Sequence, residues 1–105
     1  MICTVIVRRL KPGTYDDFRK AWEPKVWPTG MLKNWLARND DDPDVVASVT
    51  LLDLDESGLD ALRDNPEWVN AEVERLQLIG EFEEELVTSG FFRVVEEHGP
   101  AATTA

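Results

Sequence analysis

The apolar strand segments of this 105-residue chain restrict its fold more than any other feature. Residues 2–7 (ICTVIV), 45–54 (VVASVTLLDL) and 91–95 (FFRVV) are rich in β-branched and aromatic residues, which predicts strands. A strand of an antiparallel sheet that is covered on one face alternates apolar and polar residues. These segments instead carry apolar side chains at both odd and even positions. They therefore predict a sheet whose two faces are both covered.

The segments between these strands predict helices and one further strand. Thr14 is a candidate N-cap for a first helix, which Pro24 and Pro28 end. A second strand is expected over residues 31–38, before the long acidic turn that precedes the third. A short helix over residues 56–65 follows the third strand.

A longer helix is predicted from Pro66, a favoured first helical residue, to Val87 or Thr88, with Gly90 breaking the chain before the last strand. Its expected apolar stripe is Val69, Val73, Leu76, Ile79, Phe82 and Leu86, and Glu81, Glu83, Glu84 and Glu85 are expected in solvent. The resulting order, β-α-β-β-α-β, predicts an α+β ferredoxin-like fold with a four-stranded antiparallel sheet. Handedness rules place strands 1 and 3 in the middle and the two main helices on one face.

Two helices cover only one face of such a sheet. The other face would expose several Val, Phe and Leu side chains, each worth about 1.5–3 kcal/mol on burial, and apolar patches of this size mark interfaces. A symmetric homodimer packed sheet against sheet covers them; the alternatives are a monomer with an exposed patch or coverage by the C-terminal tail. We expect residues 1–97 to form one domain and residues 98–105 a flexible tail.

The charge balance excludes two classes of partner. The chain has 21 acidic and 11 basic residues, a net charge of −10. Nucleic acids and anionic membrane surfaces both select basic proteins, so neither is an expected partner. The sequence has no apolar segment long enough to cross a bilayer and no signal peptide, which favours a cytoplasmic location.

The sequence does not predict a metal or cofactor site. The acidic run Asp40, Asp41, Asp42 and Asp44 surrounds Pro43 and lacks the ligand order of an EF-hand, so it predicts a turn. Zinc needs several Cys or His ligands, whereas the chain has one of each, Cys3 and His98. Cys3 lies in an apolar strand, far along the chain from His98, so a Cys–His nucleophilic pair is not expected.

Aromatic residues are the remaining candidates for a site. Ligand cavities are lined by aromatic side chains with a few polar groups, and the proline-rich segment near Trp27 could roof such a cavity. The candidate ligand-binding residues are Tyr15, Trp22, Trp35, Arg38 and Trp68. Arg38, or else Arg8 or Arg9, could orient a phenolate or carboxylate; the alternative is that each arginine pairs with the acidic half of the chain.

Residues 1–97 resemble the dimeric α+β barrel superfamily, in particular its antibiotic-biosynthesis-monooxygenase-like branch. The resemblance lies in MICTVIVRRLKPGTYDDF, in VVASVTLLDLDESGLDAL, and in the Trp68-bearing helix that leads to GFFRVV. It implies a small homodimer, and some members oxidise aromatic polyketide-like quinols with molecular oxygen and no cofactor. Haem-degrading members use a first-strand Asn and a haem-ligating His. Here Val7 and Arg8 stand near that Asn position and the only histidine follows the last strand, so haem binding through that arrangement is not expected.

Two functions follow from this resemblance. The first is cofactor-independent oxidation of a small aromatic or quinol, bound between sheet and helices, with Arg38 or Tyr15 stabilising the substrate anion. The second is a non-catalytic ligand-binding or structural homodimer of the same fold. An RNA-binding module of ferredoxin-like topology is excluded by the acidic charge and by the absence of a basic-aromatic RNP pattern.

Overall fold

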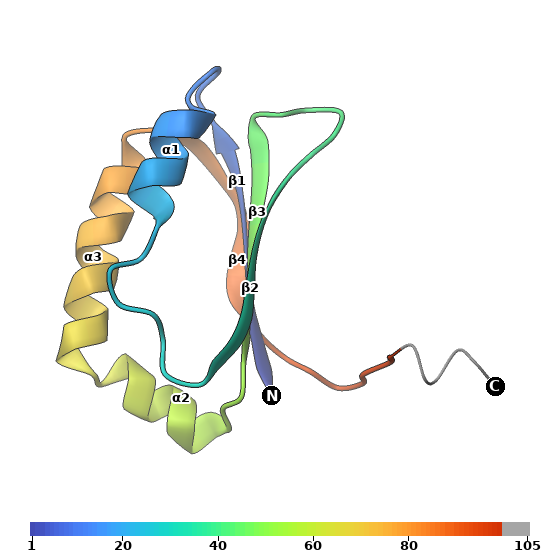
Figure 1. Cartoon of the computed structure of the whole chain (residues 1–105), viewed down its shortest axis with the longest axis vertical. Coiled ribbons are helices and arrows are strands. Elements are labelled where there is room, and N and C mark those ends of the chain that lie inside the picture. The colour runs from blue at the N-terminus through green and yellow to red at the C-terminus, as the bar shows by residue number, and fades with distance from the viewer. Residues whose placement is uncertain (100–105) are drawn as a thin grey trace.

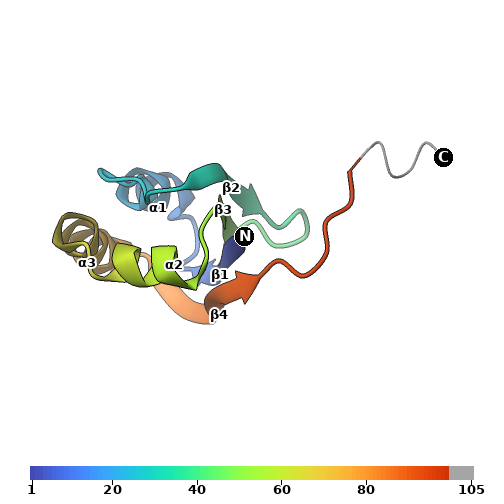
Figure 2. The ribbon, with the colours of Figure 1, turned by 90° about the horizontal axis from the view of Figure 1, so that it is seen from below.

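The computed structural model describes residues 1–99 and confirms the ferredoxin-like topology. The elements are β1 (Ile2–Leu10), α1 (Tyr15–Trp22), β2 (Met31–Arg38), β3 (Val45–Leu52), α2 (Glu56–Arg63), α3 (Pro66–Gly80) and β4 (Glu83–Arg93). The strands form one sheet in the order β2-β3-β1-β4, and every neighbouring pair is antiparallel. The helices lie on one side of this sheet (Figure 1), and α1 packs beside α3 (Figure 2).

The predicted end of the long helix is wrong. Helix α3 ends at Gly80, and β4 already begins at Glu83. The segment EFEEELV is rich in good helix formers, but as a strand it pairs with the outer edge of β1 and satisfies backbone groups that would otherwise lack partners. Gly90, expected to break the chain, lies inside this ladder opposite Val5.

The structure describes only part of the predicted C-terminal tail. The flexible tail was expected over residues 98–105, of which 100–105 lie outside the described residues. The domain limit at residue 97 stays a prediction. Among residues 1–99, no helix is long and apolar enough to cross a membrane.

The core lies between the sheet and the pair α1 and α3. Its buried members are Leu10, Phe18, Trp22, Val46 and Ile79. One cation is buried beside them: the Arg8 side chain is 3% exposed, and its Nε donates to Glu83 Oε1 at 2.9 Å. Burial lowers the pKa of the Arg8 guanidinium, and the Glu83 carboxylate opposes this effect. Glu83 is therefore an ion-pair partner on β4 rather than part of a solvated helix surface.

The opposite face of the sheet is apolar, as the sequence predicts. Val5 and Trp35 both lie opposite Val49, and Val7 lies opposite Ala47. Side chains alternate along a strand, so these residues point away from Arg8, Leu10 and the helices. No helix among residues 1–99 covers this side (Figure 1). We call it the open face: Cys3, Val5, Val7, Trp35, Ala47, Val49, Leu51 and Phe92.

The acidic run forms the connection between β2 and β3. Asn39 Oδ1 accepts hydrogen bonds from the backbone N–H groups of Asp41 (2.8 Å) and Asp42 (3.0 Å). The Asp42 carboxylate accepts a hydrogen bond from Arg9 Nη1 at 2.6 Å. These contacts close a turn, and among residues 1–99 no group of three or more His, Cys, Asp or Glu side chains could hold a metal ion.

Candidate ligand-binding site

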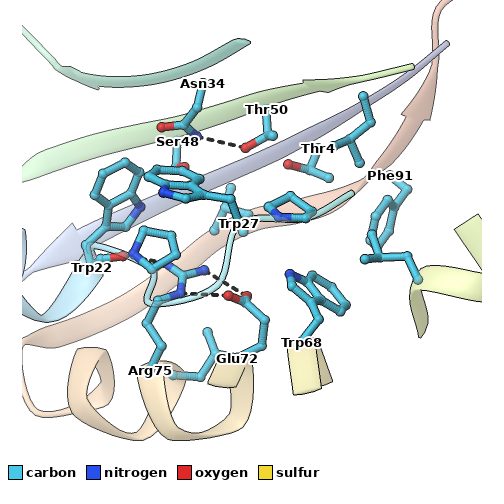
Figure 3. A pocket seen from close by; sticks show the side chains of 16 residues that line it. Thr4, Trp22, Trp27, Asn34, Ser48, Thr50, Trp68, Glu72, Arg75 and Phe91 are labelled. Atoms are coloured by element: carbon cyan, nitrogen blue, oxygen red, sulfur yellow. Dashed lines mark hydrogen bonds and ion pairs between the residues drawn. The ribbon is translucent and has the colours of Figure 1, made fainter. Parts of the chain in front are cut away.

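A cavity of about 270 Å³ lies between the helix-covered face of the sheet and the α1–α3 layer (Figure 3). Its walls are largely aromatic, from Trp22, Trp27, Trp68 and Phe91. The segment between α1 and β2 contributes Pro24, Trp27 and Pro28, so this proline-rich segment closes one side of the cavity, as its composition predicted.

The sheet side of the cavity, its floor, is partly polar. Thr4 on β1, Asn34 on β2, and Ser48 and Thr50 on β3 line it, together with the apolar Ile6 and Leu52. Asn34 Nδ2 donates to Thr50 Oγ1 at 2.8 Å. Because the Thr50 oxygen accepts this bond, its hydroxyl proton remains free to donate. A ligand resting on the floor therefore meets hydroxyl and amide groups that carry no net charge.

Helix α3 contributes an ion pair to the wall. Arg75 Nε donates to Glu72 Oε1 at 2.9 Å, and Arg75 Nη2 donates to Glu72 Oε2 at 2.8 Å. Arg75 Nη1 also donates to the backbone carbonyl of Trp22 at 2.7 Å, at the end of α1. The Arg75 side chain is 13% exposed and the Glu72 side chain is 20% exposed. The pair thus fixes α3 to α1 and adds a carboxylate to an otherwise uncharged cavity.

The indole N–H of Trp68 lacks a partner. Trp68 Nε1 is buried and has no hydrogen bond within the described part of the chain, and Figure 3 shows the indole edge that carries this nitrogen turned toward the cavity interior. Leaving a buried donor unpaired costs about 1–3 kcal/mol. A group that accepted a hydrogen bond from Trp68 would remove this cost.

The structure brings together two of the five predicted ligand-binding residues. Trp22 and Trp68 line the cavity, whereas Tyr15, Trp35 and Arg38 do not. The Arg38 guanidinium stacks on the Tyr15 ring at 3.9 Å from its centroid, and its Nε donates to the Pro43 carbonyl.

Trp35 and the other candidate arginines also lie elsewhere. Trp35 is 45% exposed and belongs to the open face. Arg8 and Arg9 pair with Glu83 and Asp42, which is the alternative that the sequence left open for these arginines.

The sequence did not identify Glu72 and Arg75 because the predicted apolar stripe gives only part of the inward face of α3. Ile79 is buried as predicted, and Leu76 lines the cavity, but Val73 is 52% exposed. The face toward the cavity and core also carries Trp68, Glu72 and Arg75, at spacings of three and four. Two charged residues can occupy this face because they form an ion pair with each other. The spacing of Glu72 and Arg75 from Trp68 is the signal that could have found them.

Comparisons with known proteins identify the fold. No family model matches the chain, and no curated protein matches its sequence. A Chloroflexus aurantiacus J-10-fl structure with the provisional name antibiotic biosynthesis monooxygenase has 18% identity and a TM-score of 0.68, covering 93% of this chain and 96% of its own. A Nitrosomonas europaea structure with the same provisional name has 12% identity and a TM-score of 0.67, covering 91% and 100%.

A third structure, Rv0793 from Mycobacterium tuberculosis, has 16% identity and a TM-score of 0.63, covering 93% of this chain and 98% of its own. At these identities the comparisons show a shared fold over nearly the whole chain. The names of the first two agree with the resemblance found in the sequence.

Proposed function

We propose that this protein is a homodimer that binds a small aromatic ligand in the cavity and promotes oxidation of a quinol or related phenol by molecular oxygen. The observation that carries the proposal is the unpaired Trp68 N–H in an aromatic-lined cavity. Aromatic walls select a flat ring, and the indole donor selects an oxygen substituent on it. The names of two structures with this fold support the reaction class.

The proposed chemistry needs little from the protein beyond binding and electrostatics. An ionised quinol or enol supplies the electrons that reduce oxygen. A cavity that excludes water and aims a fixed donor at the developing anion lowers the barrier to ionisation. We assign this role to Trp68, which lines the cavity, in place of the Arg38 or Tyr15 that the sequence analysis favoured.

Oxygen uptake tests this reaction. We expect the protein to accelerate oxygen consumption by at least one member of a panel of hydroquinones and anthrones above the rate in buffer. Rates equal to buffer across the panel would contradict the oxidation. Tryptophan fluorescence that changes on ligand addition without oxygen uptake would instead support the alternative, a non-catalytic ligand-binding dimer.

Replacing Trp68 with Phe should weaken binding of a ketone ligand. The aromatic wall is retained, but the N–H donor is lost, so affinity for 9-fluorenone should fall about five- to tenfold, the worth of one hydrogen bond. Fluorene, which lacks the carbonyl, should bind Trp68→Phe and the unmodified protein alike. Calorimetric or fluorescence titration of both ligands gives the comparison.

Trp27→Phe is the matched control, because Trp27 also lines the cavity but its indole nitrogen is not buried without a partner. It should bind both ligands about as tightly as the unmodified protein does. An equal loss for both ligands in Trp68→Phe would show that the indole N–H does not bind the carbonyl.

A further inference from the structure

Glu72 gives the cavity a proton acceptor. Of the described residues that line the cavity, Glu72 is the only acid and Arg75 the only base. We propose that Glu72 takes the acidic proton of the bound aromatic, and that Arg75 is the positioning residue that holds it there. This inference rests on the proposed oxidation and assigns a residue to its first step.

The position of Glu72 on α3 supports this role. Glu72 follows Trp68 by four residues, which places the two Cβ atoms about 5–6 Å apart on one face of the helix. Both side chains line the same cavity, as Figure 3 shows. In a ring system whose oxygen accepts the Trp68 N–H, other ring positions would therefore lie within reach of the Glu72 carboxylate.

The hydrogen bonds from Arg75 leave the Glu72 carboxylate able to accept a proton from a ligand. Each Glu72 oxygen accepts one N–H from Arg75, and a carboxylate offers about four acceptor sites, so each oxygen retains a free site. Arg75 donates three hydrogen bonds, two to Glu72 and one to the Trp22 carbonyl. The carboxylate is consequently held in one orientation within the cavity.

The Arg75 cation balances the negative charge before and after the transfer. Before it, the cavity holds the Arg75 cation, the Glu72 anion and a neutral ligand. After it, the cavity holds the same cation, a neutral Glu72 and a ligand anion. The net charge does not change, and the arginine that balanced Glu72 now balances the ligand.

For an anthrone the complete reaction balances. Glu72 removes one proton from the CH₂ carbon, and the electron pair of that C–H bond remains on the ring system as the enolate. Molecular oxygen, the oxidant, reacts with this anion to give a C–O bond and a peroxide anion. The peroxide takes the proton from Glu72, and loss of water leaves the quinone. One anthrone and one O₂ thus yield one anthraquinone and one H₂O.

Replacement of Glu72 by Gln tests the step directly. General base catalysis contributes a factor of about 100 or more, so E72Q should lower kcat for anthrone about 100-fold with KM within about threefold. Glu74→Gln is the matched control, because Glu74 is exposed and pairs with Lys25. It should keep the unmodified kcat. An E72Q enzyme with unmodified kcat would overturn the proposal.

A binding measurement separates this inference from the proposed oxidation. 2-Naphthol can donate a proton to Glu72, whereas 2-methoxynaphthalene cannot. The unmodified protein should bind 2-naphthol about tenfold more tightly, because hydrogen bonds to a charged group are worth more than neutral ones, and E72Q should narrow this ratio to about threefold or less. If the unmodified protein bound 2-naphthol and 2-methoxynaphthalene with equal affinity, that result alone would contradict the proposed contact between the ligand hydroxyl and Glu72.

The two failures are therefore distinguishable. Absence of oxygen uptake by the unmodified protein across the panel, with the naphthol preference present and dependent on Glu72, contradicts the oxidation and supports the carboxylate contact. Normal oxygen uptake by E72Q contradicts the role of Glu72 and leaves the oxidation standing. Circular dichroism and thermal unfolding establish that E72Q is folded in both experiments.

Discussion

Replacing Val49 with Asp is expected to convert the proposed homodimer into monomers. Val49 lies opposite both Val5 and Trp35, near the middle of the open face. In a dimer packed sheet against sheet, an aspartate at this site would lose its contact with water, which costs several kcal/mol. We expect the dimer dissociation constant to rise at least about 1,000-fold, which corresponds to about 4 kcal/mol.

Light scattering over a range of concentrations measures this change. The mass of Val49→Asp should approach 11.9 kDa, and that of the unmodified protein should approach twice this value. The variant should still fold, because Val49 is only half-buried within one chain. Val73→Asp is the matched control: the same substitution on an exposed position of α3 should leave the dimer intact. An unmodified protein of 11.9 kDa at high concentration would contradict the dimer.

Replacing Leu10 with Ala should produce the largest loss of stability. Leu10 is fully buried at the end of β1, within the cluster that joins the sheet to α1 and α3. Removing its buried carbons leaves a cavity that the neighbouring side chains fill only in part. The expected decrease in the free energy of unfolding is about 3–5 kcal/mol.

Urea denaturation at one fixed protein concentration measures this decrease, because the stability of a dimer depends on concentration. Leu78→Ala removes the same atoms from a side chain that is 45% exposed, and it should cost about 1 kcal/mol or less. A similar small cost for Leu10→Ala would show that this cluster is not the core of the fold.

The sequence predicted the elements whose apolar pattern is strong, but it placed the start of β4 too late because the local composition there is misleading. The apolar runs of β1 and β3 identified the central strands, and the proline residues after Trp22 marked the end of α1. The segment from Glu83 onward has the composition of a helix. Only the pairing of β4 with β1, a contact distant in sequence, makes it a strand. Single-residue propensities carry no information about that pairing.

The sequence predicted only part of the site, and the reason is related. Trp22 and Trp68 were found from their type alone, but strand register decides whether a strand residue faces the cavity. Asn34 faces the cavity, and its neighbour Trp35 faces the other way. Glu72 and Arg75 were not among the candidates, because a charged side chain is rarely buried alone and their mutual pairing is evident only in three dimensions.

The cavity floor and the open face are the two sides of the same strands. Thr4 adjoins Val5, Asn34 adjoins Trp35, and Ser48 adjoins Val49. In the proposed dimer, the subunit contact and the bound ligand would therefore lie on opposite sides of one shared layer. Thermodynamic reciprocity then applies: any preference of the ligand for the associated protein must appear, with equal magnitude, as tighter association in the presence of ligand.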